Sequence, residues 1–369
     1  MRRWILVAML AAMAVRAQAA RRVTVEQLRQ FLAEQRAANK PDGDTAAKVV
    51  GLELSEQLTG TTLDRLVADS KAGSKTAQAV AVLADASTFL EPPSSELPAT
   101  APPDITAQRV MFKGAFDFVA KTLTHLPNFL ATRVTHSFSD APIVVGHYGT
   151  GAYSDLHPVG TFSRDITYRD GREVVDATAA NDRSKNGPEP MGLTSWGEFG
   201  PALGIILTDT LKGKVTWSHW EQMAGGQAAV FRYSVPKEAS HYVVNFCCLH
   251  VDTILGVSSG SNSYHGTPGY HGALYLDPAT GSVLRITAEA ELQRSDPITR
   301  AAISVQYARM EIGGHNYLCP IRSVAISVDQ SRPGTNPTDT EVLRINEVSF
   351  TNYHRFGSTV RIVPAPAEP

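Results

Sequence analysis

The chain has 369 residues, of which 43% are hydrophobic and 19% are charged, so it contains enough apolar material for a sizeable folded core. Its 34 basic residues are slightly outnumbered by 36 acidic ones, and the net charge is −2 at pH 7. This balance excludes the basic excess with which a protein neutralises a nucleic-acid backbone, so we expect no nucleic-acid partner. The length allows two domains.

The first 19 residues have the order of charge and hydrophobicity that is typical of a secretory signal peptide. Arg2 and Arg3 precede a short apolar run at 4–15, and Ala-Gln-Ala at 17–19 matches the pattern after which signal peptidase cuts. An uncut N-terminal anchor is the alternative, but the run is too short to span a bilayer, and no later stretch is long enough. The residue directly after the cleavage pattern is not a cysteine, which disfavours a lipid anchor. The sequence therefore predicts a periplasmic or secreted protein with no transmembrane segment after cleavage.

Helical periodicity dominates residues 20–90. Thr24 and Gln27 have the spacing of a capping box, which marks the start of an amphipathic helix. A second helix is predicted at 44–58, and the alanine-rich stretch 75–89 is apolar on most sides, so we expect it to pack centrally. These patterns predict a small helical bundle. A partner-binding repeat array is the alternative, but no fixed-period self-similarity supports it.

A proline-rich segment at 91–103 follows the helical region. Five of its residues are proline, so we expect an extended linker without regular structure. Asp104 then caps a long apolar helix, which Pro127 ends. The linker therefore separates two regions of different character.

From Phe129 onward the sequence has strand periodicity, interrupted by one helix that starts at Pro201. Asp170-Gly171 is a strong hairpin signal between two strands. Strands that follow one another without crossover helices indicate a meandering antiparallel sheet. The sequence therefore predicts an α+β fold, in which residues 104–355 form an antiparallel sheet of about ten strands with helices packed on one face, and 356–369 form a disordered proline-rich tail. The predicted strands lie at 159–168, 172–177, 214–222, 228–235, 242–249, 272–276, 283–292, 301–312, 317–328 and 341–353.

The segment 270–286 is the most informative motif in the chain. Tyr270, Leu274 and Leu276 share one strand face, and the Asp-Pro-Ala-Thr-Gly turn at 277–281 leads into a second strand. This hairpin resembles one in the periplasmic lipoprotein-carrier and sigma-factor-regulator proteins. The resemblance implies a half-barrel sheet that can hold acyl chains, a hydrophobic ligand or a lipoprotein as partner, and no catalytic residue that carries over.

A second segment, 126–133, resembles a recurrent element of uncharacterised exported bacterial proteins. The resemblance to the carriers covers roughly the region from Asp104 onward in the coarse order of its elements, and it is specific only around Tyr270 to Arg285. The helical region at 20–90 has no counterpart in the carriers.

Three cysteines, Cys247, Cys248 and Cys319, would lie in an oxidising compartment, where a structural disulfide is plausible. Adjacent cysteines rarely pair, because the bond strains the peptide between them. Cys248 shares strand parity with Phe246, on the face expected to be buried, so we predict a disulfide between Cys248 and Cys319. Cys247 is the alternative partner.

The segment 256–260, with Ser258 at its centre, matches the GxSxG pattern of serine hydrolases. That pattern requires a helix directly after the serine, and 261–268 is a poor helix former. A polar turn is therefore the favoured interpretation, and we assign no catalytic residue. A periplasmic hydrolase that uses Ser258 or the histidines described next is the alternative function.

His265 and His271 lie six residues apart in a glycine-rich stretch and could share a metal with His250 or His241. No acidic residue joins them locally, and the sequence has no HExxH motif. Histidines that cover a sheet edge are the more common case, so we expect no metal site and no cofactor.

An aromatic patch across a predicted hairpin is formed by Trp217, Phe231 and Tyr233. Together with Tyr270, these residues are the candidate ligand-binding residues. Ordinary core packing is the favoured interpretation. The alternative is the wall of a hydrophobic cavity in the half-barrel. Together with the signal-peptide pattern, the carrier-like hairpin at 270–286 favours a non-enzymatic exported protein that binds a lipid, a lipoprotein or another hydrophobic ligand.

Overall fold

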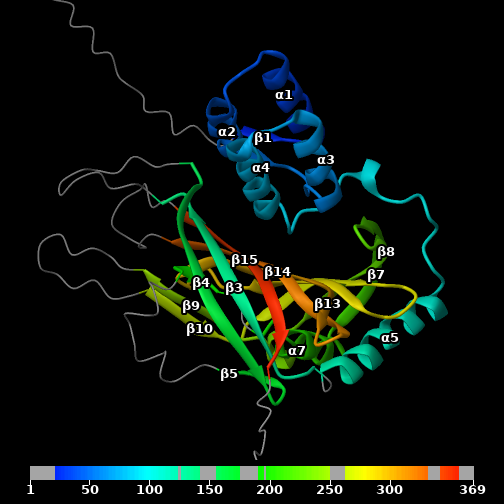
Figure 1. Cartoon of the computed structure of the whole chain (residues 1–369). Helices are drawn as coiled ribbons and strands as arrows, with labels where there is room; N and C mark the ends of the chain where they lie inside the picture. Colours follow the sequence, from blue (N-terminus) through cyan, green and yellow to red (C-terminus); the bar gives the residue numbers. More distant parts are fainter. Residues whose placement is uncertain are drawn as a thin grey trace, which may run out of the picture.

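The computed structural model describes residues 21–123, 126–141, 155–174, 190–194, 197–249, 262–330 and 341–356 (Figure 1). The predicted signal peptide, the Ser258 segment and all but the first residue of the predicted tail lie outside these residues. The described part has an α+β fold, with a helical N-terminal region, a ten-stranded antiparallel sheet and further helices. In this part of the chain no helix combines the length and the hydropathy that crossing a membrane requires.

The helical N-terminal region begins as its sequence pattern predicts. Thr24 Oγ1 accepts a hydrogen bond from the Gln27 amide at 3.1 Å, and the Gln27 side chain accepts one from the Thr24 amide at 2.9 Å, which completes the capping box. The predicted helix at 44–58 is shorter than expected. It ends at Val50 with Gly51 as its cap, and the next residues form a strand that pairs in parallel with the first strand. The elements are β1 Arg21–Val23, α1 Val25–Ala37, α2 Asp42–Val50, β2 Leu52–Leu54, α3 Gly60–Ser70 and α4 Ser74–Ala86.

The proline-rich segment between the two regions is docked against the sheet. Trp220 Nε1 donates a hydrogen bond to the Ala101 carbonyl at 2.9 Å, which ties the segment to the edge of the sheet. The Asp104 carboxylate accepts one from the Ala107 amide at 2.8 Å and so caps the next helix, as predicted. The elements here are the 3-10 turn η1 Ser94–Glu96 and the helix α5 Ile105–Leu123.

The sheet has the strand order β5-β4-β3-β15-β14-β13-β12-β11-β8-β7, and every neighbouring pair is antiparallel. This confirms the predicted large antiparallel sheet. Its first strand in sequence, β3, was not among the predicted strands, although it pairs with both β4 and β15. The strands are β3 Phe129–Ser139, β4 His157–Arg169, β5 Arg172–Val174, β7 Lys214–Met223, β8 Gly226–Val235, β11 Gly269–Leu276, β12 Val283–Glu291, β13 Ile298–Ile312, β14 His315–Gln330 and β15 Glu341–Arg355.

Both faces of the sheet are covered (Figure 1). One face, here the α5 face, packs against α5 and α7 Pro201–Thr210, whose Leu203, Ile206 and Leu207 are buried against it. The opposite face, here the α4 face, meets the helical region, where Val82 of α4 packs against a cluster on the sheet. The helices after Asp104 thus lie on one face, as predicted, and the N-terminal region covers the other. The cluster on the α4 face comprises Phe138, Val324, Ile326 and Ile345.

The Asp-Pro-Ala-Thr-Gly turn joins β11 to β12 and packs directly on α5. Asp277 Oδ1 accepts a hydrogen bond from the Ala279 amide at 2.8 Å, which closes the turn. Gly281 has φ +71°, and a Cβ placed on it would lie 2.5 Å from the carbonyl carbon of Gly114 in α5. The turn therefore requires glycine both for its backbone conformation and for this close approach.

A smaller sheet lies beside the large one, in the order β10-β9-β6. The predicted strand at 242–249 belongs to this sheet as β9 and not to the large one, which corrects its placement. Phe246 of β9 is buried in the cluster on the α5 face. The strands are β6 Gly192–Leu193, β9 Val244–Leu249 and β10 Asn262–Gly266.

The predicted disulfide is not formed in the structure. Cys319 is a free, buried thiol on β14, and burial raises its pKa to about 12. It packs in a cluster with Phe129, Tyr168 and Phe199, which is separate from the cluster that contains Phe246 of β9. The side chains of Cys247 and Cys248 lie outside the described part of the structure. The alternation of side chains along the strand suggested that Cys248 is buried. Alternation could not show that β9 belongs to a different sheet from β14, which carries Cys319.

Candidate functional site

The four aromatic residues proposed from the sequence as ligand-binding belong to the core of the α5 face. Phe231, Tyr233 and Tyr270 are buried, and Trp217 is partly buried against them. The ring of Phe112 from α5 lies 5.8 Å from that of Phe231, between centroids. Helices therefore occupy the space in which a half-barrel would hold its ligand, and the geometry favours the core interpretation over a cavity wall.

A polar contact completes this core. The Tyr270 hydroxyl donates to Asp209 Oδ2 at 2.9 Å, and Asp209 Oδ1 lies 2.6 Å from His241 Nδ1. Burial, followed by the contact with Asp209, raises the pKa of Tyr270. The arrangement joins α7 to β11 and to the chain before β9, so Tyr270 and His241 have structural partners.

The histidine doublet does not form a metal site. His265 lies on β10 and contacts Asn245, whereas His271 lies on β11, 3.7 Å from Glu291. His265 and His271 thus belong to different sheets and have different side-chain partners. His250 and Ser258 lie outside the described residues. Within the ranges that the structure describes, no group of three or more side chains could hold a metal ion. The hydrolase alternative stays a prediction.

The cavities of the α4 face lie where the helical region meets the sheet. The larger one, here the apolar cavity, has a volume of about 550 Å³, within the usual range of ligand pockets. It lies between α2, β2 and α4 on one side and the ends of β3, β4 and β15 on the other. Aliphatic and aromatic side chains dominate its lining, among them Val50, Leu52, Val82, Ala86, Phe138 and Leu343.

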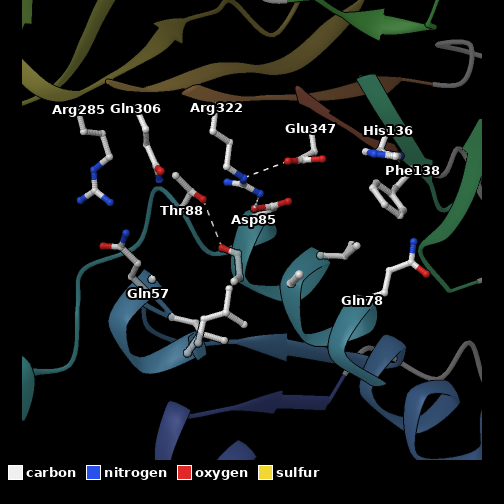
Figure 2. A pocket seen from close by; sticks show the side chains of 16 residues that line it. Gln57, Gln78, Asp85, Thr88, His136, Phe138, Arg285, Gln306, Arg322 and Glu347 are labelled. Carbon is white, nitrogen blue, oxygen red and sulfur yellow. Dashed lines mark hydrogen bonds and ion pairs between the residues drawn. The ribbon is translucent and has the colours of Figure 1, made fainter. Parts of the chain in front are cut away.

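A second cavity of about 340 Å³, here the polar cavity, adjoins the first (Figure 2). Gln78, Val82 and Phe138 line both of them, so the two share a wall. Figure 2 shows polar side chains that extend into it from both sides, the sheet above and the helical region below. The helical region contributes Gln57, Asp85 and Thr88, and the sheet contributes His136, Arg285, Gln306, Arg322 and Glu347.

Strand register brings the polar side chains of the sheet into two short transverse rows that are offset by two residues. Arg285 of β12 lies opposite Gln306 of β13, which lies opposite Arg322 of β14. Glu347 of β15 lies opposite His136 of β3. Five neighbouring strands thus each contribute one polar side chain to the face that also carries the apolar cluster of Phe138, Val324, Ile326 and Ile345.

Arg322 joins the helical region to the sheet. Its guanidinium group donates to the Asp85 carboxylate of α4, and its Nε donates to Glu347 Oε1 at 3.1 Å. Burial raises the pKa of Asp85 to about 6, although Arg322 acts in the opposite direction. The interface therefore contains a carboxyl group whose charge changes near neutral pH.

Like Asp85, Arg285 is deeply buried in the polar cavity, with 4% of its surface exposed. Its Nη2 donates to Glu221 Oε1 at 2.7 Å, and its guanidinium carbon lies 3.6 Å from the centroid of the Tyr275 ring. Its Nε is buried and has no hydrogen-bond partner in the described structure. A buried donor without a partner loses the hydrogen bond that water would give, so an acceptor that reaches Nε from the cavity would restore that bond.

The sequence did not identify these residues as a site. Arg285, Arg322 and Glu347 lie within strands that were predicted, but these strands contain other charged residues as well, so charge alone did not single them out. What periodicity could not supply is the register that aligns them or the helical region that covers them.

Comparisons with known proteins add no family to this picture. No protein-family model matches the chain, and neither a curated protein nor a solved structure matches it significantly.

Proposed function

We propose that the protein is an exported, non-enzymatic binding protein for a ligand with an apolar chain, which it holds between the helical region and the α4 face of the sheet. The observation that carries this proposal is the apolar cavity of about 550 Å³ that shares a wall with a polar cavity. Such a pair fits an amphipathic molecule, whose chain occupies the first cavity and whose head occupies the second.

The proposal keeps the ligand class that the carrier-like hairpin implies and changes its position. In this chain α5 and α7 fill the α5 face, so the ligand lies on the opposite face, beneath a helical region that the carriers lack. The sheet remains a half-barrel of the carrier type in this proposal. Export follows from the signal-peptide pattern at the N-terminus.

Burial of the acyl chain and the cost of association are of similar size. Burying an acyl chain stabilises a complex by about 0.8 kcal/mol for each methylene group, so a chain of roughly ten methylenes supplies about 8 kcal/mol. Association opposes this with about 4–15 kcal/mol of lost freedom. Contacts to the head in the polar cavity then decide whether the complex is tight.

Titration calorimetry tests the proposal with monolauroylglycerol, laurate and laurylamine, three compounds that have carbon chains of the same length and differ in head charge. We expect saturable binding of at least one of them. Ala86→Trp places an indole in the apolar cavity and should weaken that binding by tenfold or more, about 1.4 kcal/mol.

Two variants serve as controls. Ala77→Trp makes the same change on the same helix, at a position that lines neither the apolar nor the polar cavity, and should leave the affinity unchanged. Trp217→Ala removes packing on the α5 face and should lower stability without changing affinity. Absence of binding by all three compounds, or equal effects of the two alanine-to-tryptophan changes, would contradict the proposed function.

A further inference from the structure

The ionised side chains around the polar cavity are unequal in number. Two guanidinium groups, of Arg285 and Arg322, pair with three carboxylates: those of Asp85 and Glu347, which line the cavity, and that of Glu221, which does not line it but pairs with Arg285. Each guanidinium group is already paired, Arg285 with Glu221 and Arg322 with the other two. The set therefore carries an excess of one negative charge when all its members are ionised.

A head of either charge fits this set poorly. An anionic head would accept a hydrogen bond from Arg285 Nε, but it would add a negative charge beside Asp85 and Glu347 in a low-dielectric site. A cationic ammonium head would reduce the negative excess, but it has donors only and leaves Arg285 Nε without an acceptor. An anionic head therefore satisfies the Arg285 Nε donor but increases the negative charge, whereas a cationic head reduces the negative charge but leaves the donor without an acceptor.

An uncharged head with acceptor oxygens satisfies both requirements. An ester, amide or hydroxyl oxygen accepts from Arg285 Nε and brings no charge. The amide side chains of Gln57 and Gln306, which line the same cavity, offer donors and acceptors that match such groups.

We propose that the ligand is a neutral acyl compound, an ester, amide or glycerol derivative of a fatty acid, and that the polar cavity selects it against the free fatty acid and the alkyl amine. This inference rests on the proposed function and specifies the chemistry of the head.

The same three compounds test the selectivity at pH 8, where free laurate is charged. We expect monolauroylglycerol to bind about tenfold more tightly than either laurate or laurylamine. Asp85→Asn removes one negative charge and keeps an acceptor oxygen for Arg322, so it should narrow the gap between monolauroylglycerol and laurate. Arg285→Lys keeps the charge facing Glu221 and removes the Nε donor, so it should weaken monolauroylglycerol more than laurylamine.

The outcomes separate the two proposals. A preference for monolauroylglycerol that responds to both variants in these directions supports the inference. Equal binding of the three compounds, or tighter binding of laurate or laurylamine, overturns the inference and leaves the proposed function standing. Absence of binding by all three overturns both.

Discussion

Arg285 reaches the α4 face because of a β-bulge. Strand alternation places Val283 and Arg285 on the same face, but Leu276 lies opposite Val283 while Tyr275 lies opposite Arg285, so Leu284 is an extra residue in β12. The bulge turns Arg285 toward the polar cavity while Val283 stays in the core of the α5 face. Alternation alone could not predict this position, and it could not predict a partner 64 residues earlier in the chain.

The buried pair between Arg285 and Glu221 should be essential for stability. Both side chains are 5% exposed, so Glu221→Gln leaves a buried guanidinium group without its counter-charge. We expect a loss of roughly 3–5 kcal/mol in the free energy of unfolding, measured with urea. Glu53→Gln is the control, because Glu53 pairs with Arg22 at the surface and should contribute at most about 1 kcal/mol. Equal losses in the two variants would show that the buried pair has no special role.

Asp85 should make stability depend on pH in a defined direction. Its pKa is raised from 3.8 to about 6 in the folded protein, so at pH 5 the folded state binds more protons at this site than the unfolded state. The stabilising contribution is therefore complete below pH 3.8 and is lost as the pH rises through 6. The groups that face Asp85 are Arg322 and Glu347, with His136 and Arg285 in the same cavity.

The measurement compares wild type with Asp85→Asn by urea unfolding between pH 4 and pH 8. We expect wild type to lose roughly 3 kcal/mol relative to the variant over this range. A relative gain in wild-type stability as the pH rises would contradict the raised pKa.

At the scale of elements, local signals predicted most of the individual helices and strands. The capping box at Thr24 and the turn at 277–281 lie where the sequence places them, because both depend on residues within a few positions of each other. Two predictions were wrong in part: the helix predicted at 44–58 ends at Val50, and the strand at 242–249 belongs to the smaller sheet. Their outcomes depend on pairing with distant strands, which local periodicity does not contain.

The contact between the turn and α5 gives Gly281 a role beyond turn geometry. Gly281→Ala places a Cβ against the backbone of Gly114 in addition to straining a φ of +71°. Gly171 is a matched control, because its φ is +78° and a Cβ on it would meet no atom within 4 Å. We expect Gly171→Ala to destabilise by about 1 kcal/mol and Gly281→Ala by roughly 1–3 kcal/mol more, by thermal unfolding. Equal losses would mean that α5 does not pack closely on the turn.

At the scale of the whole molecule, the sequence predicted a helical region, a linker and a sheet, but not how they dock. Three long-range contacts hold the helical side to the α4 face: Arg322 with Asp85, Arg232 with Glu91, and the guanidinium group of Arg300 5.4 Å from the centroid of the Phe89 ring. None follows from local periodicity. The candidate site lies in this docked interface, and for that reason local sequence patterns did not point to it.

Hydrogen exchange with bound monolauroylglycerol tests the position of the ligand most directly. If the ligand occupies the cavities of the α4 face, amides of α4 and of the facing strands β3 and β15 should exchange more slowly in the complex. Amides of α5 and α7 should exchange at unchanged rates, because that face is filled core. Slower exchange confined to α5, α7 and β8 would place the ligand on the α5 face and contradict the account.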